Sequence, residues 1–318
     1  FEVYKFVSTA QIAAGGGGVV GRQKMSEDTS PIPRDRLIFD YDYFSGASLT
    51  PGGIDVHRIV VGFEKTYLDG RASLEVRMPF ASTLDSTSTV GLESRNTEIG
   101  DVRITPRFLA YSSETVNVGT GLGIYLPTSA DTRVRNGDGS DLARFSNDSV
   151  TLSPYLGVLF TPNDRVFSQE WISFDFDTGG SALSANVDGN GLQSLGRYRN
   201  GTQMNLDAQI GYWLINPSDQ AAVTGLAPFL ELHYGSAVTN ASMIQAGDLQ
   251  IGGGSRGDEL NLTAGVMVQL GERLNLQVGA SVPVINSDSR NFEWQVGFRL
   301  NYFFGASAAL PSRAAFIP

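Results

Sequence analysis

The sequence predicts an all-β fold: a closed antiparallel transmembrane β-barrel of about twelve strands, within a range of roughly ten to fourteen. Three observations predict it. Apolar and polar residues alternate along many segments, each about as long as a tilted strand that crosses a bilayer. Short turns between these segments alternate with long connections. No run of residues is long and apolar enough for a transmembrane helix, and a closed barrel is the other architecture that pairs every backbone group inside a bilayer.

The clearest alternation lies in residues 291–302. Every even position from Phe292 to Tyr302 is apolar or aromatic, and every odd position is polar, charged or glycine. Because alternate side chains of a strand point to opposite faces, this segment predicts a strand with one apolar and one polar face. Residues 203–214 and 259–270 repeat the pattern, and each run is long enough to cross a bilayer.

Nine further segments alternate less regularly and complete the expected twelve strands: 36–44, 56–67, 72–80, 98–111, 115–127, 149–161, 165–177, 226–235 and 273–284. The even total is typical of bacterial outer-membrane barrels. A large soluble β-sandwich would also alternate, but it would have shorter strands. Prolines count against several of these strands, because proline cannot donate to a sheet ladder; they are Pro79, Pro106, Pro154, Pro228 and Pro283.

The connections provide an independent indication. The short ones are residues 68–70, 113–114, 162–164 and 271–272, and the long ones include 128–148, 178–202 and 236–258. In outer-membrane barrels the short turns are periplasmic and the long loops extracellular, so we expect both chain ends in the periplasm. Aromatic residues near strand ends, such as Tyr67, Phe160 and Trp294, fit the girdles at the two membrane interfaces.

The chain is expected to have three parts: an N-terminal periplasmic segment (residues 1–33), the barrel (residues 34–305) and a C-terminal tail (residues 306–318). It begins with Phe1, so we expect that a signal peptide has been removed. A barrel of about twelve strands encloses more space than side chains fill, so part of the N-terminal segment is expected to enter or cap the lumen. An ordinary disordered or partner-binding tail is the alternative.

Composition excludes some classes of protein. The net charge of −10 argues against nucleic acid as a partner, because a phosphate backbone requires a basic face. Charged residues make up only 18% of the chain, which is low for a soluble protein. Cysteine is absent, so no disulfide is expected. The partners we expect are outer-membrane lipid and small solutes, without a cofactor.

Three segments resemble one family of barrels: residues 98–108, which include Gly100-Asp101-Val102-Arg103; residues 119–129, with Gly119-Thr120-Gly121; and residues 152–157, with Ser153-Pro154-Tyr155. They resemble the outer-membrane transporter family named for the MetA pathway of phenol degradation. The resemblance covers roughly residues 97–180 and rests on structural sequence motifs rather than on motifs of catalytic residues. It implies a channel for small, often hydrophobic or aromatic compounds.

Motifs for other chemistry are weak. The phrase Gly16–Gly21 matches a dinucleotide-binding fingerprint, but no strand–helix context surrounds it. Residues 186–191 resemble half of a calcium loop, but Arg197 occupies the position of the bidentate acid, so only adventitious calcium stays open. His57 and His233 are too few for a metal cluster. A histidine-dependent hydrolase is the enzymatic alternative, and we expect no enzyme, since an inward His233 beside Glu231 is more typical of a structural pair.

If the apolar face meets lipid, the other face lines the lumen. A charged wall is then predicted on the first four strands and the last one, formed by Arg36, Asp40, Asp42, Arg58, Glu64, Glu75, Arg77, Asp101, Arg103, Arg107, Glu293 and Arg299. Asp175, Asp207 and Glu231 would face it from other strands, among many inward glycines. The charged wall either satisfies its own charges by ion pairing or senses solutes, and both can hold.

These observations predict a porin-like channel for small solutes in the bacterial outer membrane. The alternative is a structural or adhesive surface protein with a filled lumen that binds partners through its extracellular loops.

Overall fold

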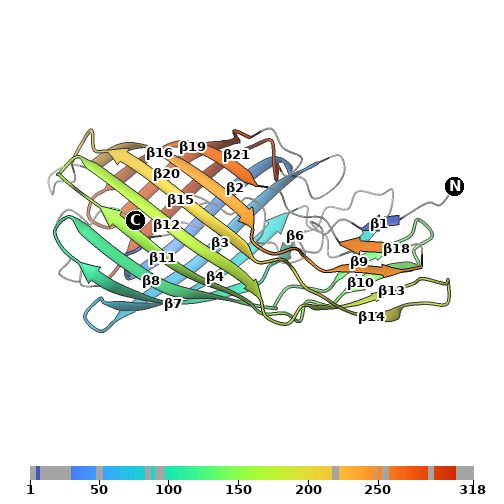
Figure 1. The fold of residues 1–318 in the computed structure, drawn as a ribbon. Coiled ribbons are helices and arrows are strands. Elements are labelled where there is room, and N and C mark those ends of the chain that lie inside the picture. Colours follow the sequence, from blue (N-terminus) through green and yellow to red (C-terminus); the bar gives the residue numbers. More distant parts are fainter. Residues whose placement is uncertain are drawn as a thin grey trace.

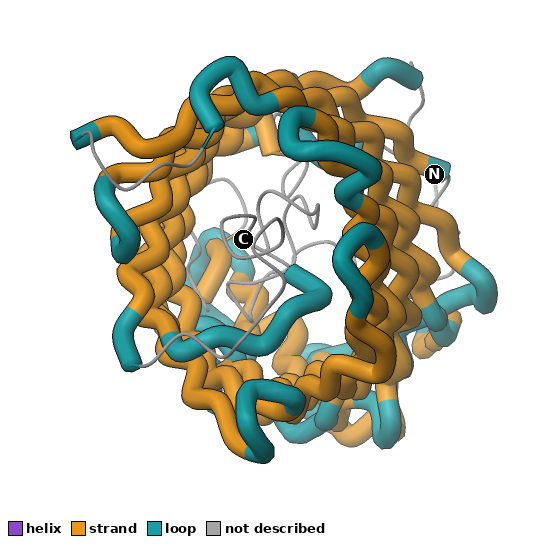
Figure 2. The backbone as a smooth tube through the Cα atoms, turned by 90° about the vertical axis from the view of Figure 1, so that its left-hand side faces the viewer, coloured by secondary structure: helices purple, strands orange, loops and turns teal. Residues whose placement is uncertain are grey.

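The structure, a computed structural model, describes residues 5–7, 30–47, 53–82, 87–89, 97–216, 222–247, 249–252, 258–285 and 290–305. Figure 1 shows a barrel with a smaller group of strands extending from one of its ends. In Figure 2 the barrel strands form a closed ring. Among the residues described, no helix has the length and apolar character needed to cross a membrane.

The ring contains twelve strands, and every neighbouring pair is antiparallel. The pairing of β3 with β4 closes it, so the predicted closed barrel is confirmed. The strands are β2 (Arg36–Ala47), β3 (Ile54–Tyr67), β4 (Ala72–Ser82), β7 (Val102–Ser112), β8 (Val116–Leu126), β11 (Thr151–Phe160), β12 (Val166–Asp177), β15 (Gln203–Tyr212), β16 (Val223–Ala237), β19 (Glu259–Leu270), β20 (Leu274–Pro283) and β21 (Trp294–Phe303).

One predicted strand began too early. The alternation of residues 98–111 continues through Gly100 and Asp101, but the structure places these two residues outside any strand. They separate the short β6 (Thr97–Ile99) from β7. Glycine and aspartate both favour turns over strands, which explains the break.

The two faces of the barrel differ as the alternation predicts. On β19, Leu262 and Val266 are exposed on the outside, whereas Asn261, Thr263 and Gln269 are buried on the inside. Because the outside is apolar and the inside polar around the ring, the barrel suits a bilayer.

The prolines interrupt the ladder locally. Pro106 pairs with Leu74 of β4, but the ladder between β7 and β8 passes from Ile104 directly to Arg107. The ladder between β11 and β12 likewise passes from Leu152 to Tyr155, beside Pro154. Pro106 and Pro154 therefore each lie where one of the two neighbouring ladders lacks hydrogen bonds. Their missing N–H donors are thus compatible with positions inside a strand.

The long connections form additional sheets that the sequence analysis missed. Five strands lie in the order β14 (Gln193–Tyr198), β13 (Ser181–Ala185), β10 (Asp141–Phe145), β9 (Thr132–Arg135) and β5 (Thr87–Thr89). Three more lie in the order β1 (Lys5–Val7), β18 (Leu249–Gly252) and β17 (Met243–Ala246). Phe145, Leu183, Tyr198 and Ile251 belong to a buried apolar cluster between them. The strands are too short for a clear period-two pattern.

Residues just before β2 lie inside the barrel at the end with the short turns. Ile32 is fully buried with Leu159 and Phe167, which flank the short turn after β11, and with Trp213, which follows β15 at the same end. A second apolar cluster, including Phe44, Val56 and Phe292, lies inside near the long connections. The charged side chains lie between these two apolar clusters.

Candidate functional site

Ten of the twelve residues predicted for the charged wall line the inside of the barrel. Nine of them are buried, and Arg103 is partly exposed. They come from five neighbouring strands, β21, β2, β3, β4 and β7. We keep the name charged wall for these ten: Arg36, Asp40, Asp42, Arg58, Glu64, Glu75, Arg77, Arg103, Arg107 and Arg299.

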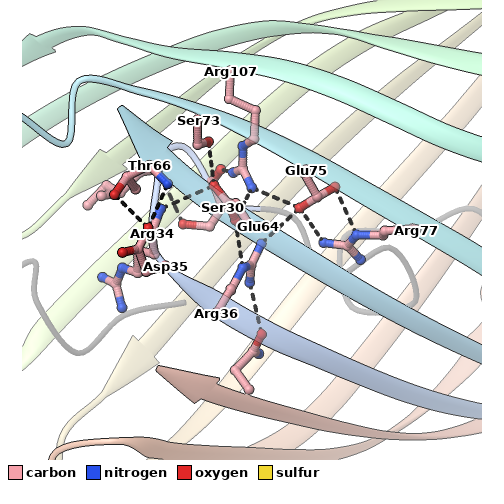
Figure 3. Close-up of polar contacts among 12 residues, drawn as sticks. Ser30, Arg34, Asp35, Arg36, Glu64, Thr66, Ser73, Glu75, Arg77 and Arg107 are labelled. Carbon is pink, nitrogen blue, oxygen red and sulfur yellow. Dashed lines mark hydrogen bonds and ion pairs between the residues drawn. The ribbon is translucent and has the colours of Figure 1, made fainter. Parts of the chain in front are cut away.

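Glu75 is the centre of the charged wall. Its carboxylate lies 3.2 Å from Arg36, 2.8 Å from Arg77 and 3.0 Å from Arg107 (Figure 3). It also lies 3.1 Å from Arg103. Antiparallel pairing explains the arrangement, since inward positions of neighbouring strands stand opposite each other. Four guanidinium groups therefore share one buried acid.

Glu64 of β3 is a second acceptor beside it. Its carboxylate lies 2.8 Å from Arg36 and 2.9 Å from Arg107, and it accepts a hydrogen bond of 2.6 Å from the Ser73 hydroxyl. The backbone N–H of Arg34 donates to the same group at 3.1 Å (Figure 3). Arg36 and Arg107 thus connect the two acids into one network.

The network continues along β2 and β21. Arg299 lies 2.5 Å from Asp42, which also accepts a hydrogen bond of 2.7 Å from Gln295. Asp40 lies 3.3 Å from Arg77. Six arginines and four carboxylates make up the charged wall, so it carries an excess of two positive charges.

The other two predicted members lie apart. Asp101 accepts hydrogen bonds from the backbone of Thr128 and Ser129 at 3.1 and 3.0 Å, at the end of β7 that faces the long connections. The Glu293 side chain is 59% exposed and lies 4.0 Å from Arg290, just before β21 begins. Alternation alone cannot show where a strand ends, so it assigned both residues to the wall.

Residues that precede β2 contact this wall and the rim of the barrel, through partners that the alternation did not predict. Arg107 donates a hydrogen bond to the carbonyl oxygen of Ser30 (Figure 3). At the rim, Asp35 accepts hydrogen bonds from Lys65 at 2.5 Å and from the Thr66 hydroxyl at 2.6 Å. Burial raises the pKa of Asp35, but the hydrogen bonds from Lys65 and Thr66 outweigh it and hold the pKa below its ordinary value. Ser30 and Asp35, at the two ends of the six-residue stretch before β2, are thus attached to the barrel.

The facing strands carry a second polar group, which we call the acidic wall: Asp175, Asp207, Glu231 and Glu259. His233 lies 2.5 Å from Asp207 through Nδ1, and its Nε2 lies 4.0 Å from Glu259. Gln209 donates to Glu231 at 3.4 Å. The histidine therefore pairs across strands with Asp207 rather than along its own strand with Glu231.

Aromatic rings fill space that inward glycines leave. The rings of Tyr155 and Trp171 stack with centroids 4.1 Å apart. A Cβ atom at Gly157 would lie 2.5 Å from the Trp171 ring, and one at Gly121 would lie 2.6 Å from the Tyr155 hydroxyl. Only glycine allows the rings to lie this close to the wall. At Gly121 and Gly157 the space beside the glycine is therefore occupied by an aromatic side chain.

The remaining motifs add no site. Within the described ranges, no group of His, Cys, Asp and Glu could hold a metal ion. In the half calcium loop, Asp188 accepts a hydrogen bond of 3.1 Å from the backbone of Asn190. The glycine phrase of residues 16–21 lies outside the described residues.

Solved structures support the fold. The chain is similar to an outer-membrane channel from Pseudomonas putida F1, with a TM-score of 0.55 and 10% identity, over 87% of this chain and 97% of that one. It is also similar to the translocator domain of the autotransporter NalP from Neisseria meningitidis, with a TM-score of 0.51 and 10% identity, over 93% and 97% of the two chains. Identities this low establish only that the chain has the fold of outer-membrane barrels. No curated protein matches the sequence.

A comparison with family models extends the resemblance that residues 97–180 suggested. The matching model is described as the MetA-pathway of phenol degradation, and it aligns with residues 13–304. The match covers nearly the whole barrel and part of the N-terminal segment. The chain therefore belongs to the family named for the MetA pathway of phenol degradation.

Proposed function

We propose that the chain is an outer-membrane channel for small solutes, and that these solutes contact the charged wall on their way through the lumen. The observation that carries the proposal is the placement of charge: the ten side chains of the charged wall lie inside the closed ring, while the outside is mostly apolar. A polar interior with an apolar exterior is the arrangement of membrane barrels that conduct solutes.

The acidic wall strengthens this proposal. An excess of positive charge on the charged wall faces carboxylates on the strands β12, β15, β16 and β19. Charges of opposite sign on facing walls create a field across the lumen, which orients solutes that carry a dipole or a charge. Ion pairing within each wall and solute sensing are compatible, because the charged wall keeps unbalanced charge.

Small aromatic compounds are the solute class that the site supports best. The stacked pair Tyr155–Trp171 lies near Arg107. An aromatic carboxylate could place its ring on the aromatic pair and its anionic group near the guanidinium. The name of the family, which refers to phenol degradation, agrees with this class.

Planar-bilayer recordings and liposome uptake test the proposal together. We expect discrete current steps from the purified protein, and faster entry of benzoate than of cyclohexanecarboxylate, which has the same charge and similar size. Trp171→Leu should remove the preference for benzoate without abolishing the current steps. A well-folded protein that gives neither steps nor uptake would contradict a channel.

We also propose that the short turns face the periplasm and that the end of the N-terminal segment, residues 30–33, caps the lumen there. The contacts of Ser30 and Ile32 inside the barrel support the cap. In this arrangement the start of β2 and the end of β21 lie on the periplasmic side. The strand β1 pairs with β18 in one of the long connections, so residues 5–7 lie with the sheets there, at the end of the barrel opposite the short turns, and the expected periplasmic placement does not extend to them.

A surface protein that binds partners through its long connections is the second candidate. It is favoured by the apolar cluster of Phe145, Leu183, Tyr198 and Ile251, because an ordered core gives these connections a defined surface. We propose no enzymatic activity, since Nε2 of His233 faces Glu259 rather than a hydroxyl nucleophile. Shortening the long connections separates the two candidates. Loss of partner binding with an unchanged current would show that the connections bind a partner and are not needed for the channel.

A further inference from the structure

One acidic side chain, Glu170, lies on the outer face of the barrel away from the strand ends. On β12, Gln169 and Trp171 point inward, so Glu170 between them points outward, where it is exposed. Val158 of β11 and Ala208 of β15 stand opposite it. A carboxylate at this position lies among apolar neighbours that would contact lipid.

The depth of Glu170 can be judged from the aromatic residues at the strand ends. Phe160 lies two residues beyond Val158, and Tyr212 lies four residues beyond Ala208, both toward the short turns. With the usual rise and tilt of barrel strands, Glu170 lies roughly 5–10 Å inside the apolar band. The residue is therefore within the membrane rather than at its surface.

Glu170 differs from the other outward charged or histidine side chains on the described parts of the twelve strands, all of which lie near the ends of β3. Lys65 pairs with Asp35 at 2.5 Å. Asp55 accepts a hydrogen bond of 3.1 Å from the backbone of Gly46, and His57 contacts the Tyr41 hydroxyl at 2.8 Å. Glu170 makes no hydrogen bond or ion pair with any described residue. An unpaired carboxyl group in hydrocarbon is unfavourable, and association with a hydrogen-bonding partner relieves it.

Some of the side chains around Glu170 on the outer face are small. Ser168 precedes it on the same face of β12, and Ala208 is its neighbour on β15. The larger Phe160 and Ile210 stand on either side of Ser168. Small residues beside a polar one let a second barrel approach closely.

We propose that this outer face, formed by β11, β12 and β15, is a dimer interface in which Glu170 of two copies shares one proton. A two-fold interface is self-complementary, so a residue near the axis meets its own counterpart. A protonated carboxyl group donates to the ionised one, which forms a strong O–H···O⁻ hydrogen bond. A second copy thus supplies the chemistry that Glu170 lacks, and each lumen stays separate.

Because the chain has no cysteine, single substitutions report the interface directly. Ser168→Cys in outer membranes should give a disulfide-linked dimer on mild oxidation. Val61→Cys, on the outer face of β3 and far around the ring, should not. Adding Glu170→Leu to Ser168→Cys should lower the dimer yield at least tenfold, whereas adding Glu170→Gln, which keeps a donor and an acceptor, should leave it within twofold.

Three results would overturn the proposal. One is a dimer yield for Ser168→Cys no higher than for Val61→Cys. Another is an unchanged yield after Glu170→Leu. The third is a monomeric protein that is more thermally stable in vesicles of phosphatidylethanolamine than in vesicles of phosphatidylcholine, with this difference lost when Glu170 is replaced. That result would assign the carboxylate to a lipid ammonium group.

Discussion

Arg107 of β7 and Glu75 of β4 lie 3.0 Å apart on neighbouring strands, although 32 residues separate them in the chain. The same guanidinium group donates to the carbonyl of Ser30. One arginine therefore joins the acid at the centre of the charged wall to the segment that precedes the barrel. Selectivity, stability and the position of that segment should consequently change together when this network is altered.

Removal of the central acid should destabilise the barrel. Glu75→Gln leaves the guanidinium groups of Arg36, Arg77, Arg103 and Arg107 without their shared charge. Breaking a buried ion-pair network by removing one partner typically costs about 3–5 kcal/mol. We expect a loss of this size in urea unfolding measured in lipid vesicles. Glu272→Gln, in an exposed turn, is the control, and an equal effect of both variants would argue against a central role for Glu75.

Arginine substitutions should distinguish the two faces of β19. Leu262→Arg places a charge in lipid, which costs roughly 2–4 kcal/mol at mid-depth. Asn261→Arg points inward, where the neighbouring strand carries His233 with its acids, so it should be tolerated. Folding yield into vesicles measures both. The face assignment would be wrong if the two variants folded equally well or if Asn261→Arg were the worse.

The alternation was sufficient to predict the barrel but not its contacts. Residues 259–270 match β19 at both ends, because every second position is apolar throughout. The partners of Arg107 could not be read from alternation, since they depend on the register between strands. Glu293 shows the same limit: its position is inward by parity, but the strand begins one residue later. The sheets of the long connections escaped prediction because strands of three to six residues show no reliable period.

The rim contact of Asp35 should make stability depend on pH in the acid range. Its folded pKa lies below the ordinary value of 3.8, so the contribution is complete above that value and is lost as the pH falls through the lower, folded pKa. Asp35→Asn should therefore be less stable than the parent at pH 7, and the difference should shrink below pH 3.8. Urea midpoints across this range measure it. A difference that grows with acid would contradict the sign of the shift.

Deletion of residues 1–30 should increase the single-channel current if the N-terminal segment caps the lumen. The deletion removes Ser30, whose carbonyl holds the segment to Arg107, and leaves β2 intact. Circular dichroism and resistance to heat in detergent serve as the folding control. A correctly folded deletion variant with unchanged conductance would show that the segment does not obstruct the path.

Current recording from a cysteine variant tests most directly whether the charged wall lines the solute path. Thr105 lies between Arg103 and Arg107 on the inner face of β7, and the chain has no cysteine of its own. A negatively charged thiol reagent on Thr105→Cys should reduce the current, while the same reagent on the outward Val61→Cys should leave it unchanged. A labelled Thr105→Cys protein with an unchanged current would contradict the account.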